Sequence, residues 1–178
     1  GGVQDQIAAS FGGMNRINFN AEGYTVNPVI ISPERKKLLN RNLMLFFTGF
    51  SRFSSDIQVA AEKNLKSKQN QLLEMLSLVD DAEKILTSKT DLEEFGRLLD
   101  YTWQLKRGIT DKVSTDSIDA VYSRALQAGA TGGKLLGAGG GGFLLFYVDP
   151  DKQENVRKAL ENLLYVPFEF ENGGTRVI

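Results

Sequence analysis

The chain has 178 residues, 42% of them hydrophobic, which suffices for one substantial domain or for one domain that carries a piece of another. Lysine and arginine total 21 against 22 acidic residues, and this balance argues against a protein that binds nucleic acid by neutralising many phosphates. Cysteine and histidine are absent, which excludes disulfide frameworks, thiolate metal sites and Ser-His-Asp or Cys-His catalysis and leaves proton transfer to carboxylate, lysine, tyrosine or water.

The first predicted elements are a short helix and a hairpin. Apolar residues recur at helical spacing in "VQDQIAASF" and stop at Gly12 and Gly13, which is typical of a helix with a glycine exit. The stretches "MNRINF" and "YTVNPVIIS" flank "NAEG" and predict a β-hairpin, in which Pro28 favours an irregular or edge second strand. We expect a domain boundary near Ser32 and Pro33.

A short helix from Pro33, a buried strand "LMLFFTG" ending at Gly49, and a long helix over residues 56–86 are predicted next. Ser55 and Gln58 fit a capping pattern at the start of the long helix. Its middle, "KSKQNQ", is wholly polar, so we expect that part to bend or protrude.

Two further helices follow. Thr90 with Glu93 predicts a capped helix that finishes at Lys106 and Arg107, where cations in the last turn suit the helix dipole. The second helix is closed by Gly129 and carries an apolar stripe at spacing i, i+3, i+4, i+7 and i+8, formed by Ile118, Val121, Tyr122, Ala125 and Leu126.

The remaining elements complete a sheet. "GGKLL" and "FLLFYV" predict two strands around a glycine cluster, Asp149 and Pro150 open a last helix, and "VPFEF" predicts a closing strand. The inner face of the last helix is expected to consist of Val156, Ala159, Leu160, Leu163 and Leu164. Antiparallel strands with helices on one face predict an α+β fold of the ferredoxin-like kind.

The glycine cluster comprises Gly137 and residues 139–142. It contains a literal G-x-G-x-x-G, but a dinucleotide-binding fold needs a strand before and a helix after this motif, and here a strand follows. No Lys-Ser or Lys-Thr follows the last glycine, so Walker A fails as well. A tight hairpin turn would account for two or three glycines. The surplus favours backbone that approaches a ligand closely and points N–H groups at an anion.

The segment "GGKLLGAGGGGFLLFYV" resembles the third conserved motif of the GHMP small-molecule kinases, and "GGVQDQIAASFGG" resembles the segment that carries the catalytic aspartate of galactokinase-like members. Within this superfamily, "LFFTGFSR", "WQLKRGIT" and "GATGGKLLGAGGGGF" are most similar to the heptose-phosphate kinases. The resemblance runs through nearly the whole chain. It implies a sugar-phosphate kinase that uses ATP and Mg²⁺, with residues 1–32 as the end of the N-terminal kinase domain and residues 33–178 as the C-terminal domain.

The resemblance also implies roles for single residues. Asp5 would be the catalytic aspartate that accepts the proton of the sugar hydroxyl, and the glycine loop of Gly137, Gly139, Gly140, Gly141 and Gly142 would support the nucleotide phosphates. From spacing alone, Asp5 is more simply a carboxylate in the first turn of a helix, stabilised by the helix dipole. Gln6 either orients the substrate or faces solvent.

Three cations are candidates for binding the phosphate of the acceptor sugar. Arg52 follows a buried strand, where a loop could carry it to a pocket. Lys106 and Arg107 follow Trp103 by three and four residues, so the three side chains could share a helix face. Ordinary surface cations are the alternative reading of all three. Lys134 either faces the glycine loop or only flanks it.

The superfamily's main nucleotide loop, of the type Pro-x-x-x-Gly-Leu-Gly-Ser-Ser-Ala, does not occur in the sequence. We expect this loop and the magnesium ligands upstream of Gly1, so that the chain alone is an inactive fragment with no metal site of its own. The apolar stretches are too short to cross a bilayer, and we expect a cytoplasmic protein that binds a sugar phosphate and ATP rather than membrane or nucleic acid. A galactokinase-like enzyme and a non-catalytic sugar-binding module are the alternatives.

Overall fold

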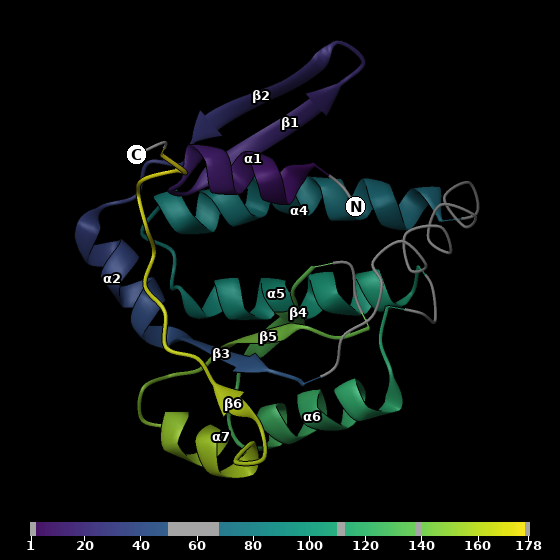
Figure 1. Ribbon diagram of the computed structural model, residues 1–178, viewed down its shortest axis with the longest axis vertical. Helices are drawn as coiled ribbons and strands as arrows, with labels where there is room; N and C mark the ends of the chain where they lie inside the picture. Colours follow the sequence, from purple (N-terminus) through teal and green to yellow (C-terminus); the bar gives the residue numbers. More distant parts are fainter. Residues whose placement is uncertain (1–2, 50–67, 110–112, 138–139, 177–178) are drawn as a thin grey trace.

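The computed structural model describes residues 3–49, 68–109, 113–137 and 140–176, which form an α+β structure as predicted (Figure 1). The elements are α1 (Gln4–Phe11), β1 (Asn15–Asn20), β2 (Gly23–Pro28), α2 (Pro33–Asn42), β3 (Leu43–Phe47), α4 (Gln69–Thr87), α5 (Glu93–Arg107), α6 (Asp116–Gln127), β4 (Gly132–Leu135), β5 (Phe143–Tyr147), α7 (Gln153–Ala159) and β6 (Leu164–Tyr165).

Four strands form the main sheet in the order β4-β5-β3-β6, and each neighbouring pair is antiparallel. Numbered along the chain from β3, this order is 2-3-1-4, the arrangement of a ferredoxin-like sheet, and the predicted fold class is confirmed. The expectation of helices on one face is wrong, because Leu43 and Tyr147 on the other face belong to a second core with residues of α2, α4 and α5. The strands β4 and β5 are the predicted pair around the glycine cluster, with Leu135 opposite Leu144. The loop between them therefore leaves the sheet at one end of these two strands.

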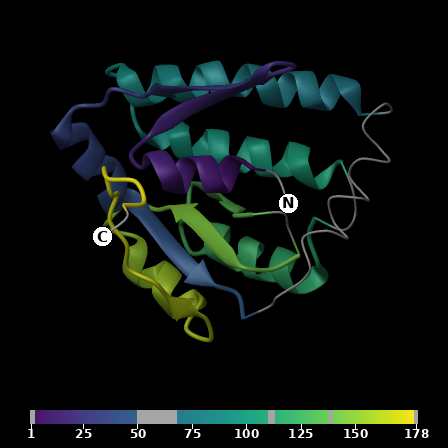
Figure 2. The same cartoon turned by 45° about the horizontal axis from the view of Figure 1, so that its top comes forward.

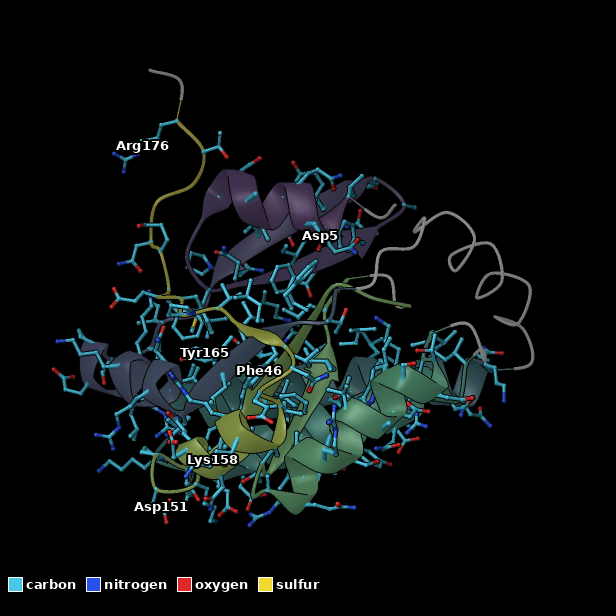
Figure 3. The ribbon with its side chains drawn as sticks, turned by 60° about the horizontal axis from the view of Figure 1, so that its bottom comes forward. Asp5, Phe46, Asp151, Lys158, Tyr165 and Arg176 are labelled. Atoms are coloured by element: carbon cyan, nitrogen blue, oxygen red, sulfur yellow. The ribbon has the colours of Figure 1, made fainter. Side chains whose placement is uncertain are left out.

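The main core lies on the sheet face that carries Met44, Phe46, Leu144 and Phe146. The apolar stripe predicted for α6 is confirmed, since its residues Ile118, Val121, Tyr122 and Ala125 are buried in this core. From α5, Trp103 is fully buried in the same cluster, and Phe46 also packs against Tyr165 of β6 with ring centroids 5.5 Å apart (Figure 3). Burial of this apolar surface stabilises the sheet on which the glycine loop is mounted.

Helix α5 lies directly against β4. A β-carbon on Gly132 would overlap the carbonyl oxygen of Gly96, and one on Gly96 would lie 2.9 Å from the ring of Tyr147. Only glycine at these two positions allows the helix and strand to approach this closely. Gly133 is equally confined, because a β-carbon there would overlap the ring of Phe146. Both glycines of the "GGKLL" segment are therefore needed for packing.

The predicted hairpin is confirmed as the two-stranded sheet of β1 and β2, which lies over α4 (Figure 1, Figure 2). Arg16 of β1 donates to Asp80 at 2.6 Å and to Glu83 at 2.9 Å, both on α4. These ion pairs are partly exposed and therefore contribute modestly to stability.

Of the two predicted capping patterns, one is wrong and the other lies outside the described residues. Helix α5 begins at Glu93, whose N–H donates to Asp91 rather than to Thr90, so the predicted Thr90 cap is wrong. The carboxylate of Asp91 fits an Asx turn, which competes with a capping box at short range. The predicted cap at residues 55–58 lies outside the described residues, and α4 is described from Gln69 onward.

The closing strand was predicted at the wrong place, since it lies before "VPFEF". Strand β6 covers only Leu164–Tyr165, and the last backbone bond to β3 runs from the Val166 N–H to the Leu45 carbonyl at 2.8 Å. Pro167 has no N–H with which to continue the ladder, so "VPFEF" is not a strand. Leu164 is 64% exposed because it belongs to this strand and not to the inner face of α7.

Replacing Tyr122 by phenylalanine is expected to lower the free energy of unfolding by about 1–3 kcal/mol. The buried hydroxyl donates to Asp100 at 2.6 Å and accepts the N–H of Gly133 at 3.1 Å. Without it, Gly133 would lose this partner, and the Asp100 oxygen would retain only the weaker bond from Gln104 at 3.2 Å among the described bonds. Tyr101→Phe is the matched control, because Tyr101 is 46% exposed and its hydroxyl bonds only to Glu74 among the described residues. Urea unfolding of both variants measures the difference, and equal losses would contradict the prediction.

Candidate active site

Helix α1 carries Asp5 in its first turn, with the side chain exposed (Figure 3). The helix ends as predicted at Gly12, whose N–H donates to the Ala8 carbonyl at 2.9 Å and whose φ of 67° suits glycine. Only Ile7 of this helix is buried. Gln6 is exposed beside Asp5, so α1 presents both predicted polar side chains outside the core.

The glycine loop is fastened to the rest of the fold at two points. Thr48, buried just after β3, donates its N–H to the Gly142 carbonyl at 2.9 Å, and its hydroxyl accepts the Gly142 N–H at 3.1 Å. The N–H of Gly140 donates to the Val113 carbonyl at 2.9 Å. Thr48 was not singled out from the sequence, although a Thr-Gly pair after a buried strand marks the position.

The rest of the loop offers backbone groups to a ligand. Gly140 has a φ of 72°, a left-handed conformation that other residues adopt only with strain. A β-carbon on Gly137 would meet nothing within 4 Å, so this side of the loop faces open space. Among the described hydrogen bonds, none uses the N–H groups of Gly137 or Gly141. These features fit a cradle for an anion better than a closed turn.

Lys106 connects the loop to the end of α5. Its ammonium group donates to the carbonyl of Gly137 at 2.7 Å. Burial, and then the positive charge of Lys134, lower the pKa of Lys106 to about 8, while the Asp5 carboxylate acts in the opposite direction. Because such interactions weaken with distance, Asp5 and Lys134 lie within electrostatic range of the Lys106 ammonium group. Burial likewise lowers the pKa of Lys134.

The other predicted site residues are distributed differently. Arg107 donates to Asp119 at 2.6 Å and to Gln104 at 3.2 Å, so its guanidinium is engaged by helices α5 and α6 and not by the glycine loop. Arg52 and Gly139 lie outside the described residues. The structure therefore bonds Lys106 to the described part of the loop and brings Asp5 and Lys134 within electrostatic range of Lys106.

A pocket of about 420 Å³ lies elsewhere, between α2 and residues 169–172, and includes neither Asp5 nor the glycine loop. The glycine loop remains the candidate site, because Lys106 bonds to it, the partly buried Lys134 lies on the strand that leads into it, and it offers backbone N–H groups. The described residues contain no group of three or more acidic side chains that could hold a metal ion. Within the same ranges, no helix is long and apolar enough to cross a membrane.

Comparison with known proteins identifies the family. Residues 82–166 match the model described as GHMP kinases C terminal. The chain is 36% identical over 163 residues to D-glycero-alpha-D-manno-heptose 7-phosphate kinase of Campylobacter jejuni, a match that covers 90% of this chain and 48% of that protein.

Solved structures agree with this match. A D-glycero-D-manno-heptose 1-phosphate kinase from Bacteroides thetaiotaomicron superposes with a TM-score of 0.67 at 30% identity, covering 98% of this chain and 47% of that one. The fold is also that of L. major mevalonate kinase, with a TM-score of 0.72 at 19% identity, covering 97% of this chain and 53% of that one. The chain spans about half the length of each of these proteins. It contains the C-terminal domain of a GHMP kinase.

Proposed function

We propose that this chain is the C-terminal part of an ATP-dependent kinase that phosphorylates the anomeric hydroxyl of D-glycero-D-manno-heptose 7-phosphate. The observation that carries the proposal is the bond from Lys106 to the Gly137 carbonyl of the glycine loop, together with the electrostatic effects of Asp5 and Lys134 on that ammonium group. The identity to a heptose 7-phosphate kinase supports the substrate. Residues 1–32 would complete the N-terminal kinase domain, and the protein would act in the cytoplasm, where ATP is available.

In this mechanism Asp5 orients the attacking sugar hydroxyl and accepts its proton. Phosphoryl transfer depends mainly on positioning and on neutralising charge, so a single carboxylate beside fixed cations is sufficient on the acceptor side. Lys106 is bonded to the loop and lies near Asp5, which fits a cation that stabilises negative charge between the two reacting groups. Lys134 would add a second positive charge at the same place.

The glycine loop fits the phosphates of ATP, which supplies the transferred phosphoryl group when bound. The N–H groups of Gly137 and Gly141 would donate to phosphate oxygens, and the bonds of Thr48 and Val113 to the loop would keep these donors in place. The described residues contain no group of three or more acidic side chains that could hold a metal ion, and in this proposal the Mg²⁺ ligands belong to the part of the protein upstream of Gly1.

The proposal is tested by assaying the full-length protein that contains this chain for ADP release. D-glycero-D-manno-heptose 7-phosphate is expected to give kcat/KM at least about 10²-fold above that for galactose or mevalonate, because a site that pairs with a substrate phosphate discriminates strongly against analogues without it. The chain by itself is expected to release no ADP with any acceptor. Sugar-dependent turnover by the isolated chain, or a preference for galactose, would contradict the proposal.

A further inference from the structure

Helix α1 carries Asp5 but buries little apolar surface that would fix its position. It has eight residues and buries only Ile7. Helices of this length are marginal by themselves, because the few hydrogen bonds they form do not offset the cost of ordering the backbone. The position of Asp5 must therefore depend on contacts that other segments make with α1.

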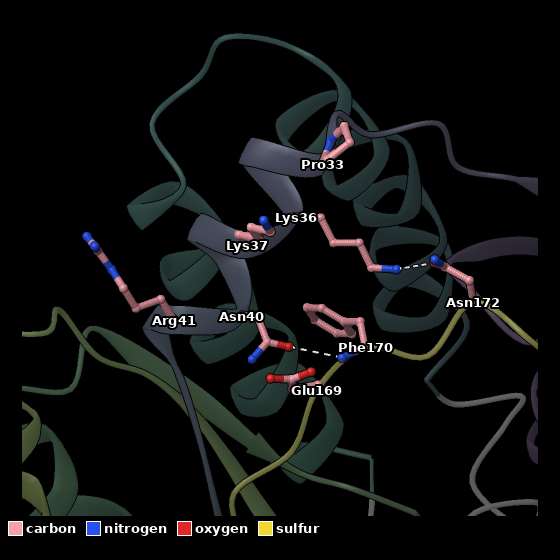
Figure 4. Close-up of a pocket in the computed structure, with 8 residues that line it drawn as sticks. All are labelled: Pro33, Lys36, Lys37, Asn40, Arg41, Glu169, Phe170 and Asn172. Atoms are coloured by element: carbon pink, nitrogen blue, oxygen red, sulfur yellow. Dashed lines mark hydrogen bonds between the residues drawn. The ribbon is translucent and has the colours of Figure 1, made fainter.

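One such segment is the stretch after β6, residues 168–175, here called the C-terminal strap. It leaves the sheet, passes α2 and returns to α1 (Figure 1). On α2, the side chain of Asn40 donates to the Phe168 carbonyl at 3.1 Å and accepts the Phe170 N–H at 3.0 Å, and Lys36 bonds to Asn172 (Figure 4). The Asn40 amide thus replaces the strand partner that the strap lacks.

The other end of the strap is hydrogen-bonded to the C-terminal half of α1 and to Gly13 just after it. The N–H of Gly13 donates to the Glu171 carbonyl at 3.0 Å, and the N–H of Thr175 donates to the Ala9 carbonyl at 3.0 Å. Between these bonds, Gly174 packs so closely that a β-carbon would overlap the carbonyl oxygen of Ser10. The neighbouring Gly173 is different, since the nearest atom to its β-carbon would be the end of the Arg176 side chain, 3.4 Å away.

We propose that the C-terminal strap is a positioning element for catalysis, which fixes α1 against α2 and thereby sets the place of the Asp5 carboxylate. This inference rests on the proposed role of Asp5. Among the described hydrogen bonds, none joins the strap to Asp5 or to the glycine loop, so the strap acts through α1. A displacement of about 1 Å in a reacting group can cost about 10²-fold in rate.

The test compares Gly174→Ala with Gly173→Ala in the full-length protein. Gly174→Ala must push the strap away from Ser10, whereas Gly173→Ala needs only a small movement of a flexible side chain. We expect Gly174→Ala to lower kcat by about 10-fold or more, with KM for the sugar phosphate within about threefold of wild type. Hydrogen exchange at the Ile7 and Gly12 amides, which bond within α1, should accelerate in Gly174→Ala only.

A second pair of variants acts far from α1. Asn40→Ala releases the strap from α2 and should reproduce both effects, and Lys37→Ala, an exposed neighbour on the same helix, should reproduce neither. Unchanged exchange in α1, or faster exchange with full kcat, would overturn the positioning role. If the wild-type protein has no kinase activity, the proposed function fails, and the exchange data alone decide whether the strap holds α1.

Discussion

Asp5→Asn is expected to lower kcat of the full-length protein by at least about 10²-fold while sugar binding changes little. Asparagine keeps the shape and most of the hydrogen bonding of the side chain but removes the negative charge and the proton acceptor. Asp5 is exposed and belongs to a helix with one buried residue, so the substitution should leave the fold intact. The loss therefore reports on chemistry and not on stability.

Asp116→Asn is the matched control for this experiment. Asp116 is also an exposed carboxylate in the first turn of a helix, α6, so both variants lose the same favourable interaction with a helix dipole, worth about 0.3–1 kcal/mol. Of these two carboxylates, Asp5 is the one that acts electrostatically on Lys106, whose ammonium group bonds to the glycine loop. The measurement is kcat against pH for both variants, with sugar affinity from calorimetry. Near-full activity of Asp5→Asn would leave Asp5 as a helix-terminal carboxylate.

The fold was predictable where one local pattern determined the outcome. The stripe of α6 has a period that matches the helix, and its residues Ile118 and Ala125 are fully buried. The hairpin at the glycine cluster and the helix exit at Gly12 follow from equally local signals. The prediction of the closing strand was wrong because Pro167 has no N–H to donate to β3, and the apolar pattern of "VPFEF" does not reveal this. After Pro167, the side chain of Asn40 supplies the hydrogen bonds instead.

The geometry around the candidate site was not predictable from the sequence. Lys106 and Arg107 are adjacent cations, and the sequence offers no reason to separate them. On a helix, successive side chains point about 100° apart, so Lys106 reaches Gly137 while Arg107 pairs with Asp119. Thr48 was missed because its role is to hold Gly142, a residue 94 positions away. Contacts of this kind depend on how the chain closes and leave no local pattern.

Lys106 is expected to control the alkaline side of the activity profile. Its pKa in the folded protein is about 8, lowered from an ordinary value of 10.5 chiefly by burial. A lysine with a lowered pKa is charged below pH 8 and becomes neutral as the pH rises through that value. Between about pH 8 and 10.5 the unfolded chain binds more protons than the folded one at this position, so this group makes stability rise with pH across that window.

Activity should fall as the pH rises, in contrast to stability. Burial disfavours the charged form of Lys106, but an anionic substrate needs that positive charge. We expect kcat/KM to fall above about pH 8 as Lys106 deprotonates in the free enzyme. Lys106→Met should lower the plateau by about 10²-fold and abolish this fall, since removal of one stabilising donor typically costs 10²–10³-fold. Lys106→Arg should abolish the fall and retain more of the plateau, because arginine stays charged at every pH used.

The control for Lys106 is Lys158→Met, which removes an exposed ammonium group on α7 and should leave the whole profile unchanged (Figure 3). The measurement is kcat/KM for the sugar phosphate from pH 6 to 10, with saturating ATP. A fall near pH 8 that persists in Lys106→Met would assign that titration to another group, and the ammonium group bonded to Gly137 would then serve only to hold the loop. A plateau that survives Lys106→Met unchanged would likewise remove Lys106 from the site, because no anion would depend on its charge.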